Sequence, residues 1–461
     1  PAFHISAPIG WINDPNGFSI FNEEYHLFYQ YNPYSSMWGS IHWAHVKSKD
    51  LVNWEYLDIA IAPDEAYDIS GCFSGSAIEK DGKLYLMYTG NQDPGGFENL
   101  RQVQCIAVSE DGINFTKYEN NPVIDSTKLP KEAIIQDFRD PKVYKKGDKY
   151  YSVIGSRNLD DSGQILLYSS DDLLNWNYEG NILQSNNEFA KMWECPDFFN
   201  IDGKNVLVIS PQEVRATKDG FHNGNNTAFL IGEYDKENKK FNREKTKVID
   251  FGLDFYAPQT FEDKDGRRIM IGWMHSWENR IIPNEFKWCG MMTIPREIRI
   301  KDNNVIQTPI KEIENYYGDT VKYEKITIDK EVSLEGINGR VLDMTLDIDA
   351  SKAEEFEIKF AKNNEYETII RYYSKRNTIE FDRSYSGKYG DILHKREMKV
   401  KDNDGKLRMR LVLDKYSAEI FANDGEQVMT STFYTPLDAQ DITLSSKGKS
   451  ILSIEKHKID I

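Results

Sequence analysis

DGKLYLMYTG, residues 81–90, is a turn followed by an apolar strand, and it decides the fold because it recurs. D-G pairs between apolar runs are typical of tight hairpins. The pattern returns about every 60 residues, as NEEYHLFYQ (22–30), KGDKYYSVIG (146–155), DGKNVLVIS (202–210) and DGRRIMIGW (265–273). Self-similarity at a fixed period indicates a repeat architecture.

A second repeated element supports this interpretation. S-x-D-x-apolar-N-aromatic appears with equally spaced aspartates in SKDLVNW (48–54), SEDGINF (109–115) and SDDLLNW (170–176). Five such units of short strands predict an all-β fold that begins with a five-bladed β-propeller over residues 1–302. The repeat stops at residues 303–319, which we expect to be a linker with a short helix. The different β-rich pattern of residues 320–461 predicts a β-sandwich.

The composition narrows the possible partners. The chain has 461 residues and a formal net charge of −17, so nucleic acid and anionic membranes are disfavoured because both would be repelled. Four scattered cysteines indicate neither a disulfide framework nor a zinc site. No apolar run reaches the roughly 18 residues of a membrane span, and no leader is visible at Pro1, although a chain without an initial Met could have a trimmed start. We therefore expect a cytoplasmic protein.

The motifs that carry chemistry lie about ten residues before each apolar strand. They are NDPNG (13–17), FSGSA (73–77), RDPK (139–142), ECPD (194–197) and YAPQ (256–259). The first strand of each propeller blade lines the central channel, so equivalent positions converge at one end of the axis. We therefore expect Asp14, Asp140 and Glu194 to meet there.

Three carboxylates around one channel favour acid–base chemistry. Like charges and burial raise at least one pKa, so that one carboxyl stays protonated while another stays ionised. Glycoside hydrolysis needs this combination. The neighbouring side chains suit a sugar, with ring faces from Trp11, Trp38, Trp193 and Trp273 and hydrogen-bonding groups from Asn13, Gln30, Ser74 and Arg139. Asp137 and Asp197 miss the repeated positions, and we interpret both as structural.

These motifs resemble those of the invertase, levanase and sucrose-6-phosphate hydrolase family of glycoside hydrolases. The resemblance is carried by FHISAPIGWINDPNG (3–17), FRDPK (138–142), WECPD (193–197) and EIFANDGEQVMTS (419–431), and thus covers nearly the whole chain. It implies a propeller followed by a sandwich and a retaining β-fructofuranosidase activity on small carbohydrates. Ala44 departs from the family, which commonly has glycine at this position, and residues 210–226 also look individual.

The resemblance also implies roles for single residues. Asp14 would be the nucleophile, Asp140 the transition-state stabiliser and Glu194 the general acid/base. The fructose subsite would be lined by Asn13, Gln30, Trp38, Phe73, Ser74, Arg139, Tyr256 and Trp273. No metal or organic cofactor is required by this chemistry.

Several alternatives stay open from the sequence. A fructosyltransferase of the same family would use the same covalent ester, and an arabinanase/xylosidase-like propeller would use three similar acids. A carbohydrate-binding propeller without activity is a further alternative, which the three intact acids disfavour. The sequence does not separate sucrose, sucrose 6-phosphate and longer fructans. It also leaves the oligomeric state open, with the sandwich as a possible interface.

Overall fold

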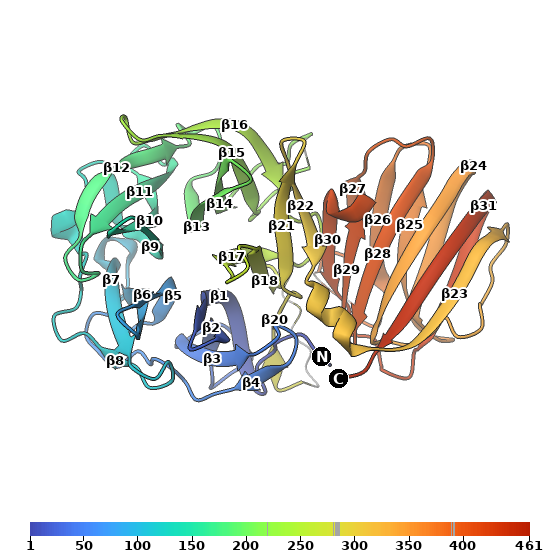
Figure 1. The fold of residues 1–461 in the computed structure, drawn as a ribbon, viewed down its shortest axis with the longest axis horizontal. Coiled ribbons are helices and arrows are strands. Elements are labelled where there is room, and N and C mark those ends of the chain that lie inside the picture. Colours follow the sequence, from blue (N-terminus) through green and yellow to red (C-terminus); the bar gives the residue numbers. More distant parts are fainter. Residues whose placement is uncertain (219, 280, 282–285, 389, 391) are drawn as a thin grey trace.

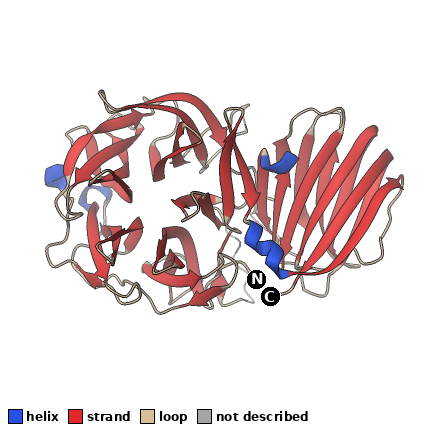
Figure 2. Cartoon of the chain, viewed as in Figure 1, coloured by secondary structure: helices blue, strands red, loops and turns tan. Residues whose placement is uncertain are grey.

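The computed structural model describes residues 1–218, 220–279, 281, 286–388, 390 and 392–461. It contains a ring of small sheets followed by a second β domain (Figure 1), and strands dominate both domains (Figure 2). Short 3-10 helices are η1 (Phe97–Asn99), η2 (Ser126–Lys128), η3 (Lys311–Tyr316) and η4 (Asn423–Gly425). None of the helices in the described part of the chain is long and apolar enough to cross a membrane.

The ring is a five-bladed propeller, which confirms the predicted fold class. The first two blades contain β1 (Gly10–Phe21), β2 (Glu24–Asn32), β3 (His42–Ser48), β4 (Trp54–Tyr56), β5 (Cys72–Lys80), β6 (Lys83–Gln92), β7 (Arg101–Ser109) and β8 (Thr116–Lys117). The next two contain β9 (Ala133–Lys146), β10 (Lys149–Asn158), β11 (Gly163–Ser170), β12 (Asn177–Gln184), β13 (Met192–Ile201), β14 (Lys204–Gln212), β15 (Ala228–Asp235) and β16 (Lys240–Val248). The fifth contains β17 (Tyr256–Glu262), β18 (Arg268–Met274), β20 (Met291–Met292), β21 (Arg296–Lys301) and β22 (Asn304–Pro309).

The repeated S-x-D element is a turn between the third and fourth strands of the first three blades. In the first, the Asp50 carboxylate accepts hydrogen bonds from the backbone N–H groups of Val52 and Asn53. Asp111 and Asp172 make the corresponding bonds in the next two blades. The equal spacing in the sequence therefore has a local cause, because each carboxylate satisfies the backbone of one tight turn.

The ring is closed by a return of the chain to its first blade. The short strand β19 (Trp288–Cys289) pairs in parallel with the start of β1, with Gly10 opposite Trp288. Ser6 bridges to Met291, which belongs to the fifth blade. The first and last blades are thus joined by backbone hydrogen bonds, so the inner strands are held in a complete circle.

The second domain is built from long antiparallel strands. They are β23 (Tyr317–Ile328), β24 (Leu342–Lys362), β25 (Glu367–Tyr373), β26 (Thr378–Tyr385), β27 (Lys395–Lys399), β28 (Lys406–Asp414), β29 (Ser417–Ala422), β30 (Gln427–Thr432) and β31 (Asp441–Ile459). The first part of β24 pairs with β28 and its later part with β25, while β31 follows both parts. The long strands β24 and β31 therefore connect both parts of one nine-stranded sheet, whose buried apolar side chains form one core.

The structure differs from the expected linker of residues 303–319. β22 (Asn304–Pro309) pairs with β21 along its whole length and is the outer strand of the fifth blade. η3 follows it, and β23 already begins at Tyr317. The S-x-D turn that precedes the outer strand in the first three blades is absent before β22, so the repeat gave no signal for this strand. We propose to place the boundary at Ile310.

A buried ion cluster joins the two domains. Glu419 on β29 accepts hydrogen bonds from His4 at 2.8 Å, from Arg296 at 2.6 Å and from the backbone N–H of Ile294 at 2.8 Å. Asp414 on β28 contacts the other ring nitrogen of His4 at 2.8 Å. Burial lowers the pKa of His4, but the hydrogen bonds to these two carboxylates outweigh burial and raise it to about 9. His4 is therefore charged at neutral pH.

Removing the centre of this ion cluster should destabilise the protein strongly. Glu419→Ala would leave the buried charges of Arg296 and His4 without their shared partner, which typically lowers the free energy of unfolding by about 3 to 5 kcal/mol. Denaturant unfolding followed by tryptophan fluorescence measures this change. Glu455→Ala is the matched control, because Glu455 pairs with Lys322 on the exposed face, and it should cost no more than about 1 kcal/mol. Equal losses in the two variants would contradict this role.

Candidate active site

Every inner strand of the propeller changes its pairing register at its motif. The shifts fall between Ile12 and Pro15, Phe73 and Gly75, Arg139 and Lys142, Glu194 and Asp197, and Tyr256 and Gln259. Such β-bulges re-aim side chains. Asp140, Cys195 and Ala257 have φ values of 66°, 48° and 50° at these bulges. As a result, consecutive residues such as Asn13 and Asp14 both line the central pocket, although neighbours on a regular strand point to opposite faces.

Asp14 lies at the floor of the pocket and is held from three sides. The hydroxyl of Ser74 donates to its Oδ2 at 2.5 Å, the Gln30 amide donates to Oδ2 at 3.2 Å, and the Asn13 amide donates to Oδ1 at 3.2 Å. Burial, followed by the charge of Glu194, raises the pKa of Asp14 to about 6. The hydrogen bonds fix the orientation of a carboxylate that is ionised above that pH.

Asp140 is the second carboxylate at the floor. Its Oδ2 accepts a hydrogen bond from the backbone N–H of Cys195 at 2.9 Å, and its own N–H donates to Thr89 Oγ1 at 3.0 Å. The Cys195 thiol lies between the two aspartates, 3.5 Å from Asp14 Oδ2 and 3.6 Å from Asp140 Oδ2. Burial and the charge of Glu194 raise the pKa of Asp140 to about 7, while the Arg139 guanidinium acts in the opposite direction.

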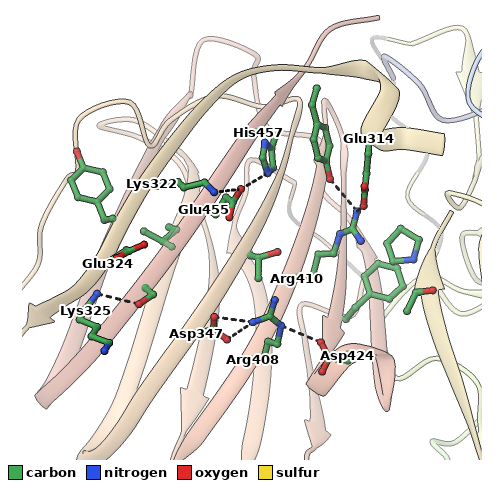
Figure 3. Close-up of a pocket in the computed structure, with 18 residues that line it drawn as sticks. Glu314, Lys322, Glu324, Lys325, Asp347, Arg408, Arg410, Asp424, Glu455 and His457 are labelled. Carbon is green, nitrogen blue, oxygen red and sulfur yellow. Dashed lines mark hydrogen bonds and ion pairs between the residues drawn. The ribbon is translucent and has the colours of Figure 1, made fainter. Parts of the chain in front are cut away.

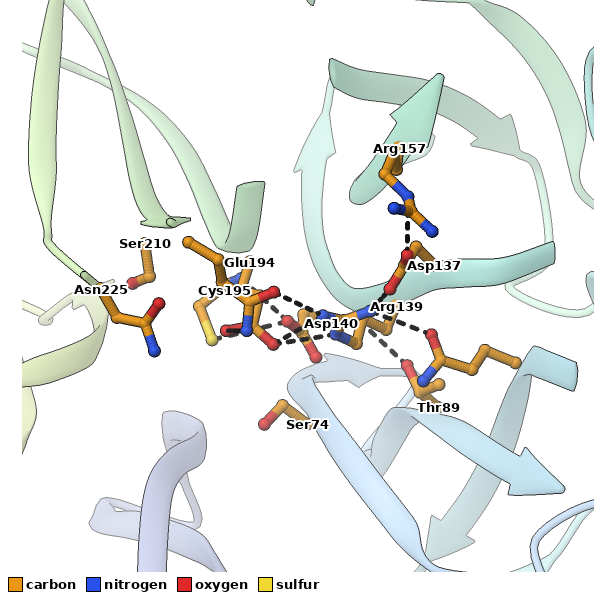
Figure 4. A network of polar contacts seen from close by, with 12 residues as sticks. Ser74, Thr89, Asp137, Arg139, Asp140, Arg157, Glu194, Cys195, Ser210 and Asn225 are labelled. Carbon is orange, nitrogen blue, oxygen red and sulfur yellow. Dashed lines mark hydrogen bonds and ion pairs between the residues drawn. The ribbon is translucent and has the colours of Figure 1, made fainter. Parts of the chain in front are cut away.

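Glu194 is the last paired residue before the bulge of its strand, whereas Asp14 and Asp140 lie inside theirs. We infer that its carboxylate lies one residue nearer to the mouth. Arg139 Nε donates to Glu194 Oε1 at 2.9 Å. Tyr256 Oη and Gln212 Nε2 donate to Glu194 Oε2 at 2.7 Å and 2.8 Å. Figure 4 shows Arg139 between Glu194 and Asp137. Both oxygens of Glu194 are therefore oriented by fixed donors.

The pocket is a blind cavity at the end of the propeller axis. Its volume is about 410 Å³, and it is lined by Asn13, Asp14, Gln30, Trp38, Phe73, Leu100, Gln102, Gln136, Asp137, Arg139, Asp140, Glu194 and Trp277. Beneath the floor, around Ser74, Asp140 and Cys195, the remaining space is only about 10 Å³. A ligand can therefore enter from one end only, and its terminal unit meets the carboxylates.

Most residues predicted for the site line the cavity, but Trp11, Ser74, Trp193, Tyr256 and Trp273 do not. Trp273 is fully buried and lies beside Trp11 and Trp277, with ring centroids 5.6 Å and 5.0 Å away, so it supports the pocket from behind instead of lining it. Tyr256 reaches the site only through Glu194. Trp193 is also buried and bonds the carbonyl oxygen of Phe189. Asp197 accepts from Thr260 and pairs with Lys142, as expected for a structural residue.

Other pocket residues lay outside the predicted set. Leu100, Gln102, Gln136 and Trp277 line the cavity, as does Asp137, which we had interpreted as structural. Gln212 contacts Glu194 from the end of β14, which corresponds in its blade to the end of β2, where Gln30 lies. The ends of the repeated apolar strands, YHLFYQ and VLVISPQ, were the signal in the sequence that pointed to this position.

A larger groove of about 830 Å³ lies mainly on the second domain and shares no lining residue with the carboxylate pocket (Figure 3). It lies over β23, β28 and β31, and its charges are largely paired with each other. Arg408 pairs with Asp347 at 2.8 Å, and Lys322 pairs with Glu455 at 2.9 Å. Size alone therefore does not mark the reactive site, and we assign it to the smaller cavity that holds the three carboxylates.

Comparisons with known proteins cover the whole chain. The family model described as "Glycosyl hydrolases family 32 N-terminal domain" matches residues 4–309, and the corresponding C-terminal model matches residues 312–460. A sucrose-6-phosphate hydrolase of Zymomonas mobilis is 36% identical over 92% of this chain and 84% of its own length. A raffinose invertase of Escherichia coli is 34% identical over 98% of this chain and 93% of its own length. A family 32 β-fructofuranosidase of Bombyx mori has a TM-score of 0.88 and 33% identity, covering 100% of this chain and 94% of that one.

The raised pKa of Asp14 predicts a gain in stability when its charge is removed. Because the folded pKa of about 6 exceeds the ordinary value of 3.8, this group stabilises the fold most below pH 3.8, and that contribution is lost as the pH rises through 6. At about pH 7.5, ionised Asp14 thus costs about 3 kcal/mol. Asp14→Asn should raise the melting temperature there, and the gain should disappear near pH 4. Asp161→Asn, at an exposed position, is the control, and a lower melting temperature for Asp14→Asn at both pH values would refute the prediction.

Proposed function

The chain belongs to family 32 of the glycosyl hydrolases and is a glycoside hydrolase of the β-fructofuranosidase type, and from this we propose that its pocket binds a terminal β-fructofuranosyl unit. The observation that carries the proposal is the blind pocket, with an oriented Asp14 at its floor and Glu194 one residue nearer to the mouth. A blind pocket admits only the end of a chain. The bond to be broken then lies at the level of Glu194.

We propose that Asp14 is the nucleophile of a double displacement. Its ionised carboxylate attacks the anomeric carbon while Glu194 donates a proton to the glycosidic oxygen, so the leaving group departs as an alcohol. Water then attacks the fructosyl ester, Glu194 takes up the proton, and Asp14 is released as a carboxylate. Two displacements retain the anomeric configuration.

We assign Asp140 to transition-state stabilisation. It lies at the floor beside Asp14, and its carboxylate contacts the backbone N–H and the thiol of Cys195. Hydrogen bonds from the ring hydroxyls of the sugar to Asp140 would strengthen as positive charge develops on the ring. Arg139 and Tyr256 act through Glu194, since both donate to its carboxylate, and they are positioning residues for the proton donor.

The first test is the stereochemistry of the product. The enzyme should release fructose from sucrose-type β-fructosides and essentially none from arabinan or xylan oligomers, because the sugar unit that we assign to the floor is a terminal β-fructofuranosyl unit. NMR of the first-formed fructose should show the β-anomer. If the α-anomer appears first, Asp14 acts as a base on water and the double displacement is wrong.

The second test distinguishes the roles of Asp14 and Glu194 by the pH dependence of kcat/KM. For the wild type, kcat/KM should fall below about pH 6, because Asp14 takes up a proton there and can no longer attack the anomeric carbon. With an activated fructoside whose leaving group needs no acid, Glu194→Gln should still turn over in its first step. Its acid limb should move below pH 6, since the charge of Glu194 no longer raises the pKa of Asp14. An acid limb that stays at the same pH would contradict the coupling.

A further inference from the structure

Most of the curated relatives, among them proteins of Zymomonas mobilis, Escherichia coli and Bacillus subtilis, are named for sucrose 6-phosphate, and another of Escherichia coli is named for raffinose, so the substrates stated by these names differ in whether they carry a phosphate. Building on the proposed function, we infer that the leaving-group side of this pocket accepts a neutral sugar, and that Asp137 is the specificity residue that disfavours a phosphorylated one. Glu194 must touch the glycosidic oxygen, so the leaving group extends from Glu194 toward the mouth. Gln136 and Asp137 line that part of the cavity, because they precede Arg139 on β9.

The Asp137 carboxylate forms ion pairs with two arginines beside this wall, Arg139 and Arg157. Its Oδ1 accepts from Arg139 Nη1 at 2.6 Å, and its Oδ2 lies 2.9 Å from Arg157 Nε. Figure 4 shows the resulting series from Arg157 through Asp137 to Arg139 and Glu194. Arg157 also pairs with Asp161 at 3.3 Å and lies over the ring of Phe97. Neither guanidinium is therefore left to neutralise a phosphate.

The ionisable side chains that line the cavity are mainly carboxyl groups. Four carboxylates, those of Asp14, Asp137, Asp140 and Glu194, face it, against the single guanidinium of Arg139. Charges of like sign repel strongly in a partly enclosed cavity, because the effective dielectric is low. A phosphate dianion on the leaving sugar would enter this field. A neutral sugar instead meets acceptors for its hydroxyl groups.

The mouth of the cavity also carries acidic side chains. The β6–β7 loop carries Asp93 and Glu98, and the guanidinium of Arg101 beside it bonds backbone carbonyl oxygens of the loop. Apolar rings and side chains are exposed at the same rim, with Trp38 at 50% and Phe97 at 52% of their surface. Ring faces of this kind pack against the C–H faces of sugars. Acidic loops with exposed rings fit a neutral sugar.

The test compares kcat/KM for sucrose and sucrose 6-phosphate at low and at high salt. The wild type should prefer sucrose roughly tenfold or more at low salt, and the preference should narrow at high salt because the repulsion is screened. At low salt, Asp137→Asn should raise kcat/KM for sucrose 6-phosphate relative to that for sucrose. The ratio of the two values should therefore move closer to one. Asp161→Asn is the matched control, since Asp161 pairs with the same Arg157 but does not line the cavity, and it should leave the ratio within about twofold.

The outcomes separate this inference from the proposed function. Equal use of the two substrates, or a preference for the phosphorylated one, would overturn the inference while leaving fructoside hydrolysis intact. An unchanged ratio in Asp137→Asn would overturn the role of Asp137. If neither substrate yields fructose, the proposed function itself fails. Should Asp137→Asn not fold, wild-type product inhibition decides, because glucose should inhibit more strongly than glucose 6-phosphate and the reverse order would refute the inference.

Discussion

The site depends on one backbone constraint, a β-bulge at the same point of all five inner strands. A regular strand would aim Asn13 and Asp14, or Arg139 and Asp140, to opposite faces. The bulge turns both members of each pair toward the axis, so a narrow channel receives two rows of functional side chains. Proline follows the bulged residue in four of the strands, at 15, 141, 196 and 258, where a missing N–H costs little because the ladder is already interrupted.

The crowding that results has an energetic cost and a chemical use. Burial and the charge of Glu194 raise the pKa values of Asp14 and Asp140 to about 6 and 7, so the folded protein holds carboxylates that would be more stable when protonated. The Ser74 hydroxyl orients the carboxylate of Asp14, and the Arg139 guanidinium orients that of Glu194. The same field that tunes acid–base chemistry also opposes an anionic leaving group. Stability, pH dependence and substrate charge are therefore linked through the same few groups.

The second domain supports this arrangement from outside the channel. Val412 and Phe421 of the sandwich pack in the same apolar cluster as Ile269 and Ile294 of the propeller. Glu419, within this interface, binds His4 from the beginning of the chain and Arg296 from the fifth blade. His4 precedes the first blade and Arg296 belongs to the last one. Both bind Glu419 of the second domain, so the buried ion cluster joins the first and last blades. Rigid closure keeps the inner strands in register.

The sequence by itself determined the propeller, the second β domain and the three carboxylates, because hairpin turns and inner-strand motifs recur at fixed spacing and repeat positions converge on an axis. It did not reveal β22 or the inward role of Asp137, since neither carries a repeated motif. It also placed Trp273 in the pocket, whereas Trp273 is buried and Trp277 lines the cavity instead. Only the tertiary structure decided these points, because burial and ion pairing depend on residues from different blades meeting in space, and the spacing along one chain does not contain that information.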